Sequence, residues 1–292
     1  MILKTIASIG LGALIALTAG AANAQTVKIG SKNFTEQFVV AEIYAQALEK
    51  AGLTVERRLN LGATLIAHSA LTSGEIDLYP EYTGTALASV VKGDLSGSAD
   101  KIYKDVKDYY EKNLQLTLLD PTQINNGYAI ITLPATAEKY KLKTLSDLGP
   151  PSKELSFGAE GGFGERKDGL PGLKQTYGIE FKDFRIFAKL GIRYSALTSG
   201  NIDVSYGFST DWQIADSNLV VLDDDKHLFP PYYLVPVVRQ DTLAKTPKIA
   251  EVLNKISPLL TNEIMRDLNA AVERDKKEPK EVAEEFLKEK GI

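Results

Sequence analysis

A nine-residue stretch occurs twice in this chain. The sequence reads SALTSGEID at residues 69–77 and SALTSGNID at residues 195–203, so that only Glu75 and Asn201 differ. The 126-residue offset between the copies is far longer than the period of a solenoid or propeller repeat. Chance similarity between two helix ends is the alternative, because Ser, Ala, Leu, Thr and Gly are common there. We interpret the pair as one similar structural unit in each of two lobes.

The first 24 residues differ in kind from the rest. Lys4 supplies one positive charge, an apolar run follows, and Ala22-Asn23-Ala24 matches the A-x-A cleavage pattern. The apolar run is shorter than the roughly 20 residues that a membrane span needs. We therefore predict a signal peptide over residues 1–24, cleaved after Ala24, rather than a membrane anchor.

Composition narrows the class of protein. Of the 292 residues, 44% are hydrophobic and 25% are charged, which is typical of a folded globular protein, and the net charge of −4 gives no support to nucleic-acid binding. The chain has no cysteine, so it has neither disulfides nor the thiol that a bacterial lipoprotein needs. His68 and His227 lack partners at metal-site spacing. We predict a periplasmic protein without lipid anchor, metal or cofactor.

The first part of the chain alternates predicted strands and helices. Residues 26–32 predict a strand, residues 35–51 a helix with an apolar stripe, and residues 53–62 a second strand. The first copy of the repeat predicts a helix that ends at Gly74 and leads into a strand reaching Tyr82. This β-α-β-α-β order favours a parallel sheet.

The same alternation restarts later in the chain, and helices follow from Thr246 onward. We therefore predict an α/β protein with two lobes. Residues 25–129, completed by residues 236–292, form lobe one, and residues 130–235 form lobe two. The two crossings, near residues 130 and 235, predict a hinge, and the cleft between such lobes is a preferred ligand site.

Motifs for catalysis are missing from the sequence. It contains no H-E-x-x-H, no G-x-S-x-G and no cysteine nucleophile, and GFSTD lacks the second glycine of a nucleophile elbow. GAEGGFGERKDG at residues 158–169 is rich in glycine but lacks the GK[ST] of a phosphate-binding loop. We interpret this segment as a loop at the edge of the cleft and predict that the protein is not an enzyme.

Aromatic residues stand at equivalent ends of the two repeated units. The offset of the repeat places Tyr82 opposite Phe208, five residues beyond each Ile-Asp pair. It also places Thr83 opposite Ser209, and each of these two hydroxyls could cap a following helix. Two aromatic rings are therefore predicted at corresponding strand ends of the two lobes.

Further aromatic residues lie at the crossings. Tyr128 follows an Asn-Asn-Gly turn, and Tyr232 follows Phe-Pro-Pro. Core packing is the alternative role for any one of these rings. Together with Tyr82 and Phe208 they are expected to converge on the cleft from both lobes.

Converging rings suit a quaternary ammonium ion. Such an ion has no N–H to donate, and ring faces attract it with roughly 0.5–2 kcal/mol per ring. Three or four rings together with burial reach the roughly −8 kcal/mol of micromolar binding. If the ligand is a betaine, Arg166 and Lys32 are candidates from opposite lobes for holding its carboxylate.

Several stretches together resemble the osmoprotectant-binding proteins of ABC importers. These are VKIGSKNFTEQ, LYPEYTGTAL, NNGYAI, the F-x-x-R-x-D-G-x-P-G-L-x-x-T-Y-G pattern at 163–178, FSTD and FPPYYLVPVVR. They extend in order over nearly the whole chain after the predicted signal peptide. The resemblance implies a type II periplasmic-binding-protein fold. It also implies a quaternary amine ligand, such as glycine betaine, choline or carnitine, that is passed to a membrane permease with an ATPase subunit.

The resemblance also implies site residues by position. The implied aromatic cage consists of Tyr82, Tyr128, Phe208 and Tyr232, with polar contacts from Thr85 and Asn126 and with Lys32, Gln37 and Arg166 at the polar end of the ligand. Two positions depart from the family pattern. Phe208 stands where many relatives have tyrosine, and Trp212 follows STD where relatives often have glycine. Trp212 is expected either to line or narrow the cleft or to pack behind it, and the role of Tyr206 stays open.

Three functions are compatible with the sequence. The first is a monomeric binding protein for a quaternary amine, where Arg166 and Lys32 favour a zwitterion because they repel a ligand that is only cationic. The second is a binding protein for another small solute such as an amino acid, whose primary ammonium would need Glu36, Glu81 or Asp211 as acceptor. The third is a periplasmic enzyme or chaperone on the same scaffold.

Overall fold

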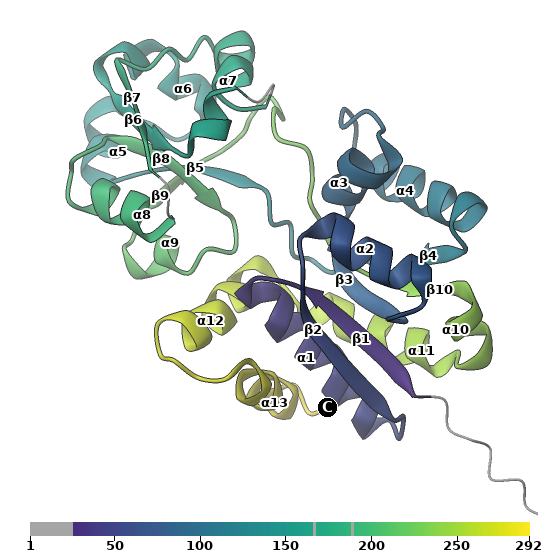
Figure 1. Cartoon of the computed structure of the whole chain (residues 1–292). Helices are drawn as coiled ribbons and strands as arrows, with labels where there is room; N and C mark the ends of the chain where they lie inside the picture. Colours follow the sequence, from purple (N-terminus) through teal and green to yellow (C-terminus); the bar gives the residue numbers. More distant parts are fainter. Residues whose placement is uncertain (1–25, 166–167, 188–189) are drawn as a thin grey trace, which may run out of the picture.

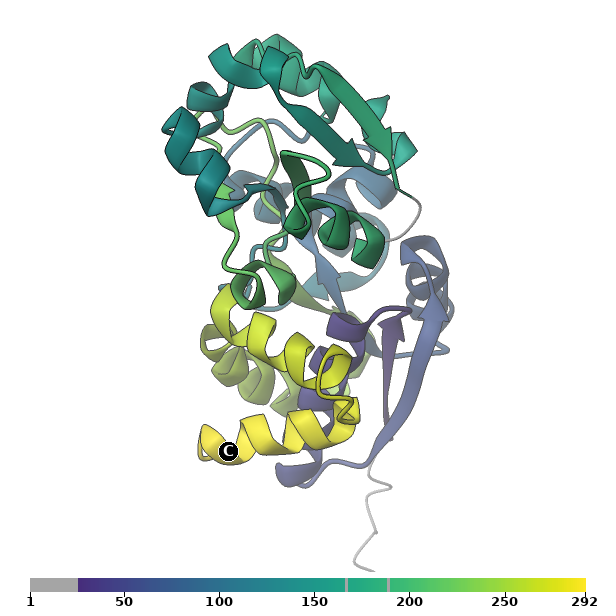
Figure 2. The same ribbon diagram turned by 90° about the vertical axis from the view of Figure 1, so that its left-hand side faces the viewer.

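A computed structural model describes residues 26–165, 168–187 and 190–292. The predicted signal peptide and Arg166 lie outside the described residues. The chain forms two α/β lobes, each built on its own five-stranded sheet (Figures 1 and 2). None of the helices in these ranges is long and apolar enough to cross a membrane.

The sheet of lobe one has the strand order β2-β1-β3-β10-β4. Its strands are β1 (Val27–Lys32), β2 (Val55–Gly62), β3 (Leu78–Tyr82), β4 (Leu116–Leu118) and β10 (Leu234–Arg239). β1 pairs in parallel with β2 and β3, whereas β10 is antiparallel to β3 and β4. The expected parallel sheet is therefore only part of a mixed sheet. The β-α-β-α-β pattern covers only three strands. The strand β10 joins this sheet after the chain has passed through lobe two.

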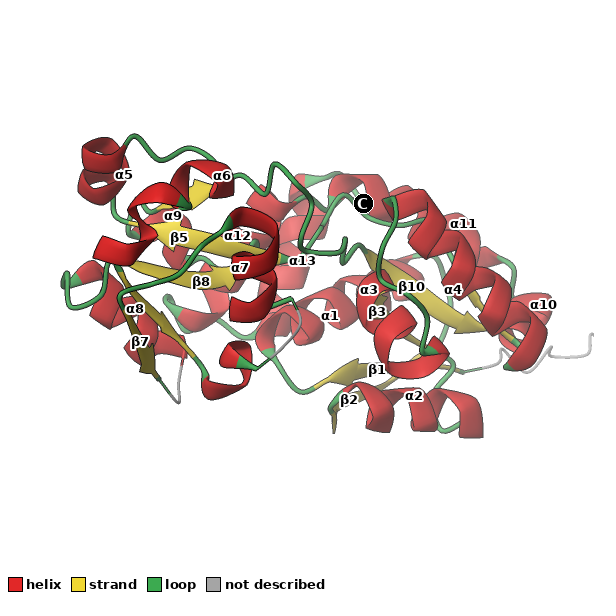
Figure 3. Ribbon diagram, turned by 90° about the horizontal axis from the view of Figure 1, so that it is seen from above, coloured by secondary structure: helices red, strands yellow, loops and turns green. Residues whose placement is uncertain are grey.

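Helices cover both faces of this sheet, as Figure 3 shows. They are α1 (Thr35–Lys50), α2 (Thr64–Ser73), α3 (Thr83–Ala86), a π-helical turn (Leu87–Val91), α4 (Ala99–Asn113), α10 (Gln240–Lys245), α11 (Lys248–Ile256), a 3-10 turn (Ser257–Leu259), α12 (Asn262–Glu273) and α13 (Pro279–Glu289). On one face the buried helix α1 packs with α11, α12 and α13, and on the other α2 and α4 close a second apolar cluster.

The sheet of lobe two repeats this arrangement with the order β7-β6-β8-β5-β9. Its elements are β5 (Tyr128–Thr132), α5 (Pro134–Tyr140), α6 (Leu145–Leu148), a 3-10 turn (Pro150–Glu154), β6 (Ser156–Ala159), a 3-10 turn (Gly161–Gly164), α7 (Leu170–Tyr177), β7 (Asp183–Ile186), α8 (Leu190–Thr198), β8 (Val204–Phe208), α9 (Gln213–Asp216) and β9 (Val220–Leu222). β6 is parallel to β7 and β8, and β5 is antiparallel to β8 and β9, so each strand has a counterpart in lobe one.

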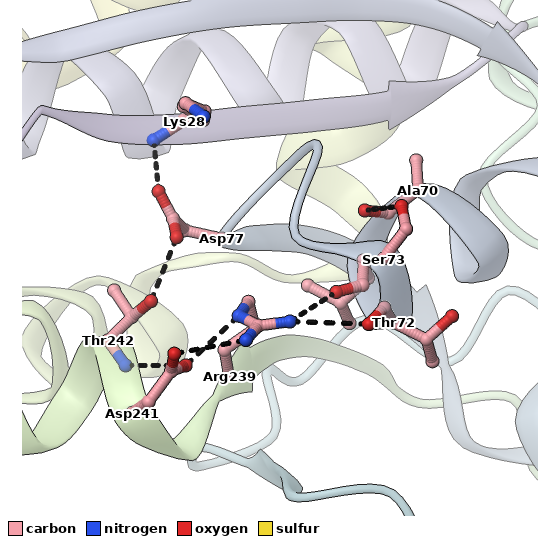
Figure 4. Close-up of polar contacts among 9 residues, drawn as sticks. Lys28, Ala70, Thr72, Ser73, Asp77, Arg239, Asp241 and Thr242 are labelled. Carbon is pink, nitrogen blue, oxygen red and sulfur yellow. Dashed lines mark hydrogen bonds and ion pairs between the residues drawn. The ribbon is translucent and has the colours of Figure 1, made fainter.

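The two copies of the nine-residue repeat adopt the same local structure in both lobes. Each copy contains the C-terminal part of a helix, α2 or α8, and leads into the central strand β3 or β8. At the end of each copy an aspartate accepts a backbone N–H from the neighbouring parallel strand: Asp77 from Lys28 at 2.8 Å, and Asp203 from Ser156 at 2.8 Å. Figure 4 shows the Asp77 contacts, which include the Thr242 hydroxyl. The prediction of one similar unit in each lobe is confirmed.

The capping role predicted for Thr83 and Ser209 is wrong. α3 begins without a side-chain cap, and α9 begins only at Gln213. Instead, the backbone N–H of Thr83 donates to the Tyr233 carbonyl at 2.9 Å, and that of Ser209 donates to the Gly127 carbonyl at 3.0 Å. The Ser209 hydroxyl also bonds the Gly127 carbonyl. Thr83 and Ser209 therefore bind the two crossing segments. They can do so because these segments run beside the ends of β3 and β8.

Two segments cross between the lobes side by side. Residues 119–127 lead from β4 to β5, and residues 223–233 lead from β9 back to β10 (Figure 1). The Asn126 N–H donates to the Tyr232 carbonyl at 3.1 Å, and the Tyr232 N–H donates to Asn125 Oδ1 at 2.8 Å. The crossings therefore form one hydrogen-bonded ribbon at the junction of the lobes.

Candidate functional site

A cavity of about 640 Å³ lies where the two lobes meet. Most of the predicted site residues that the structure describes line it: Lys32, Tyr82, Thr85, Asn126, Tyr128, Phe208 and Tyr232. Gln37 and Trp212 are not among the lining residues. The structure thus brings side chains from both lobes and from both crossings to one cavity.

The rings enter the cavity from strand ends. Tyr82 is the last residue of β3 and Phe208 the last residue of β8, as the offset of the repeat predicted. Tyr128 opens β5 directly opposite Phe208 in the antiparallel pair, and Tyr232 stands two residues before β10. Strand ends at the junction of two sheets are fixed by the ladders behind them, so the rings have little freedom to move away.

The rings of lobe two form a packed wall. The centroid of the Tyr128 ring lies 5.4 Å from Phe208, 5.2 Å from Tyr206 and 5.3 Å from Phe229. Tyr206 is buried and stacks on Phe163 at 4.5 Å, so it supports the wall from behind and does not line the cavity. Aromatic neighbours at these distances hold the exposed faces of Tyr128 and Phe208 in place.

The rings of lobe one lie around a lysine. Tyr82 is 5% exposed and stacks on Phe34, a residue that is 40% exposed, at a centroid distance of 6.4 Å. The Lys32 ammonium lies 4.6 Å from the centroid of Tyr82 and 5.9 Å from that of Phe34. Phe34 was missed by sequence reasoning, although a large apolar residue directly before a helix start was the available signal.

Lys32 forms a buried ion pair with Glu81. Glu81 also accepts the Tyr79 hydroxyl at 2.9 Å and the Tyr82 backbone N–H at 2.7 Å. The charge of Lys32 is therefore balanced by the protein itself. Gln37, buried behind it, accepts the Lys32 backbone N–H at 3.2 Å.

Glu36 places a carboxylate in the lining of the cavity. It accepts the Tyr82 hydroxyl at 2.5 Å, the Asn126 amide at 3.1 Å and the Asn269 amide at 3.3 Å. Burial raises the pKa of Glu36 and also raises the pKa of Tyr82 well above its usual range. Sequence reasoning weighed Glu36 only as an acceptor for a primary ammonium. Its contact with α12 could not be read from the sequence.

Asp211 adds a second carboxyl group on the side of lobe two. It accepts the Tyr194 hydroxyl at 2.8 Å and the Phe208 backbone N–H at 2.9 Å. Burial raises the pKa of Asp211 to about 6. With Glu36 and Glu273, the lining contains three carboxyl groups and, among its described residues, one ammonium that is already paired. Such a lining attracts a cation.

Gly84 allows a close approach between α3 and the second crossing segment. A Cβ atom at Gly84 would lie 2.8 Å from the Pro231 carbonyl oxygen and 2.8 Å from a ring carbon of Tyr232. The Tyr232 ring can lie against α3 only because position 84 has no side chain.

Trp212 stands at the contact between lobe two and α12. Its indole N–H donates to Glu273 at 2.9 Å. The structure thus places Trp212 beside the cavity and not in its lining. Among the described residues there is no cluster of three or more His, Cys, Asp or Glu side chains that could hold a metal ion.

Two α/β lobes of matching topology, joined by two crossings around an aromatic cavity, define a solute-binding protein of the type II fold. The chain belongs to the OpuAC family, described as the substrate binding domain of an ABC-type glycine betaine transport system, which matches residues 25–289.

Relatives agree with this assignment. The carnitine transport binding protein OpuCC of Listeria monocytogenes is 35% identical over 92% of this chain and 88% of its own length. EgtU of Helicobacter pylori, named an ergothioneine transport permease/ergothioneine binding protein, is 36% identical over 90% of this chain. This chain spans only 47% of EgtU. A solved structure named a glycine betaine/carnitine/choline ABC transporter has a TM-score of 0.86 at 32% identity, covering 90% of this chain and 98% of that one.

Proposed function

We propose that this protein captures a quaternary ammonium compound in the cavity between its lobes and presents it to a membrane permease for uptake. The ammonium group binds among the rings of Tyr82, Tyr128, Phe208 and Tyr232. Contact with three or four ring faces at roughly 0.5–2 kcal/mol each, with burial, is sufficient for micromolar affinity. The observation that carries the proposal is the convergence of rings from both lobes on one cavity with an acidic lining.

The polar part of the ligand is held by side chains beside the rings. We assign polar contacts to Thr85 and Asn126, which line the cavity. Lys32 lies in the same lining, where its ammonium keeps donors beyond its bond to Glu81. Gln37 acts from behind, because it accepts the Lys32 backbone N–H. Arg166 stays a prediction for the carboxylate of the ligand.

A small amino acid is the second candidate ligand. Glu36 supports it, because its carboxyl oxygens belong to the cavity lining and can accept hydrogen bonds from a primary ammonium. The rings favour the quaternary amine, since a primary ammonium is better satisfied by hydrogen bonds than by ring faces.

The family supports a setting outside the cytoplasmic membrane, where binding proteins of ABC importers work. We propose that the signal peptide predicted over residues 1–24 exports the chain and that no lipid anchor is attached. We propose a monomer that meets a permease with an ATPase subunit. In EgtU the name joins permease and binding protein, and this chain matches about half of that length.

Calorimetry of residues 25–292 tests the function. The ligands are glycine betaine, carnitine, choline, ergothioneine and several amino acids, all at one ionic strength. We expect saturable one-to-one binding of at least one quaternary amine, without turnover. Binding of amino acids alone would favour the second candidate ligand, and turnover of a ligand would identify an enzyme.

A further inference from the structure

Each lobe exposes a pair of large apolar side chains near the end of an edge strand. The pair of lobe one is Leu65 and Ile66, and the pair of lobe two is Ile186 and Ile192. All four residues are more than half exposed, and only two other large hydrophobic residues of the described chain are exposed at all. Apolar side chains that gather at one place on a surface mark a contact surface.

The repeat relates the two pairs to one another. Ile66 and Ile192 are separated by the 126-residue offset between its copies, and each stands in the first turn of its helix, α2 or α8. The next residue in each helix, Ala67 or Arg193, is buried. The two helices therefore present an isoleucine to solvent at the same position.

Both pairs lie at the sheet edges that border the cavity. β1 is parallel to β2 and β3, and β6 is parallel to β7 and β8, so the carboxyl ends of each set lie together. Tyr82 and Phe208, which end β3 and β8, line the cavity. Ile186 ends β7, and a Cβ atom at Gly62, which ends β2, would lie 2.7 Å from Ile66 Cδ1. The two pairs therefore border the same cleft as the rings.

Both pairs also lie away from the crossings. β2 and β7 stand at one side of their sheets, whereas the crossings leave and enter through β4, β10, β5 and β9 at the opposite side. Figure 3 shows the start of α2 and the end of β7 on the same side of the molecule. Ala63 and Thr64, directly before Leu65, line the cavity. A turn of the lobes about the crossings therefore changes the distance between the two pairs.

We propose that the two pairs are apolar lips that meet when the lobes close around a ligand. This inference rests on the proposed function and adds a contact that stabilises the closed form. Closure then buries four side chains that are exposed in this structure, and the burial of apolar surface favours the closed form. It also excludes water from the rings, where a cation binds more strongly once it is desolvated. Part of the affinity thus derives from side chains that do not touch the ligand.

An engineered pair of thiols tests the contact, because the chain has no cysteine of its own. In the double variant Ile66→Cys with Ile192→Cys, saturating glycine betaine or carnitine should speed joining by a short bismaleimide crosslinker at least about tenfold. Ile66→Cys with Val221→Cys is the matched control, since Val221 is exposed in β9 at the opposite edge of the sheet of lobe two. Equal acceleration of both pairs, or none in the first pair when ligand binds, would overturn the proposal.

Calorimetry of the isolated protein gives a second readout. Ile66→Ser should weaken glycine betaine and carnitine by a similar factor, about 3- to 30-fold, the range for losing part of the burial of one isoleucine. Its effect should be smaller in the background of Ile192→Ser, because the two side chains then no longer share a contact. Val221→Ser should leave both affinities unchanged.

The outcomes separate the lips from the ligand site and from a permease. Unchanged affinities of Ile66→Ser and Ile192→Ser together with reduced uptake by cells would assign the two pairs to docking on a permease and overturn the proposal. If the wild-type protein binds no quaternary amine, the proposed function fails. If it binds one and the crosslinking of Ile66→Cys with Ile192→Cys is not accelerated, only the lips fail.

Discussion

Trp212 of lobe two donates its indole N–H to Glu273, the last residue of α12 in lobe one, at 2.9 Å. The same helix makes further contacts with this segment: Arg266 donates to the Ser209 carbonyl at 2.8 Å, and Asn269 donates to the Thr210 carbonyl at 3.1 Å. Figure 1 shows α9 beside α12. The segment that follows Phe208 is thus fixed to lobe one independently of the two crossings.

Glu273→Ala should weaken the binding of every quaternary amine by a similar factor, about 3- to 10-fold, because it removes both the contact that sets the spacing of the cavity walls and one carboxyl group of the lining. Trp212→Phe should have a smaller effect, because it removes the contact alone, and the double variant should be no worse than Glu273→Ala. Calorimetry with two ligands measures this. Trp212 is the only tryptophan, so its emission should also shift to longer wavelength in Glu273→Ala.

Asp267→Asn is the control for this pair, because Asp267 is exposed on the same helix. Its affinities and emission should match wild type. Losses in Glu273→Ala that differ strongly between ligands would mean that Glu273 contacts the ligand directly.

Phe208→Leu should weaken quaternary amine binding about 3- to 30-fold, since one ring face is lost while the apolar volume is nearly kept. Phe229→Leu is its matched control. Phe229 packs on the same Tyr128 ring at 5.3 Å but does not line the cavity. Equal effects of the two substitutions, measured by calorimetry, would assign Phe208 to packing alone.

Gly84→Ala should reduce affinity, because the added methyl group meets the Tyr232 ring and the Pro231 carbonyl. We expect about a tenfold loss with a lower melting temperature, as for other overpacked sites. Gly191→Ala, in α8, adds a methyl group that meets nothing within 4 Å and should slightly raise stability. Unchanged binding in Gly84→Ala would show that the Tyr232 ring can move without cost to the ligand.

Asp211 predicts a pH dependence of stability. Its pKa in the folded protein, about 6, lies above the ordinary value of 3.8, so the folded state binds its proton more tightly than the unfolded state. The contribution of Asp211 to the free energy of unfolding is therefore complete below about pH 4 and is lost as the pH rises through 6. The free energy of unfolding falls over this range by at most about 1.4 kcal/mol per pH unit.

Urea unfolding at pH 4.5, 5.5 and 7 should show this loss in wild type and a flatter profile in Asp211→Asn. The asparagine keeps an oxygen that can accept from Tyr194. Parallel profiles for the two proteins would contradict the elevated pKa of Asp211.

Local sequence patterns predicted most helices and strands of the fold. They could do so because the spacing of apolar residues differs between helices and strands. The helix from Thr35, the strand ending at Tyr82 and the helices after Thr246 each have a complete apolar pattern and clear ends. The antiparallel strands were not predicted, since β4 has three residues and β10 joins lobe one only through a crossing.

Tyr82 and Phe208 could be predicted at the site because the repeat aligned them, whereas the partners of the charged residues could not be predicted. Lys32 and Glu81 stand 49 residues apart, and only the pairing of β1 with β3 brings their neighbourhoods together. Arg193 stands next to the second copy of the repeat, at the position that holds Ala67 in lobe one. In the sequence it reads as an ordinary helix residue, and only its burial sets it apart.

The bonds from Thr83 and Ser209 to the crossings have a mechanical consequence. Each is the next residue after a cavity ring, Tyr82 or Phe208, so both rings are fastened close to any axis about which the lobes turn. Displacement in a rotation grows with distance from the axis. We therefore expect a turn of the lobes about such an axis to move the cavity rings less than the mouth of the cavity.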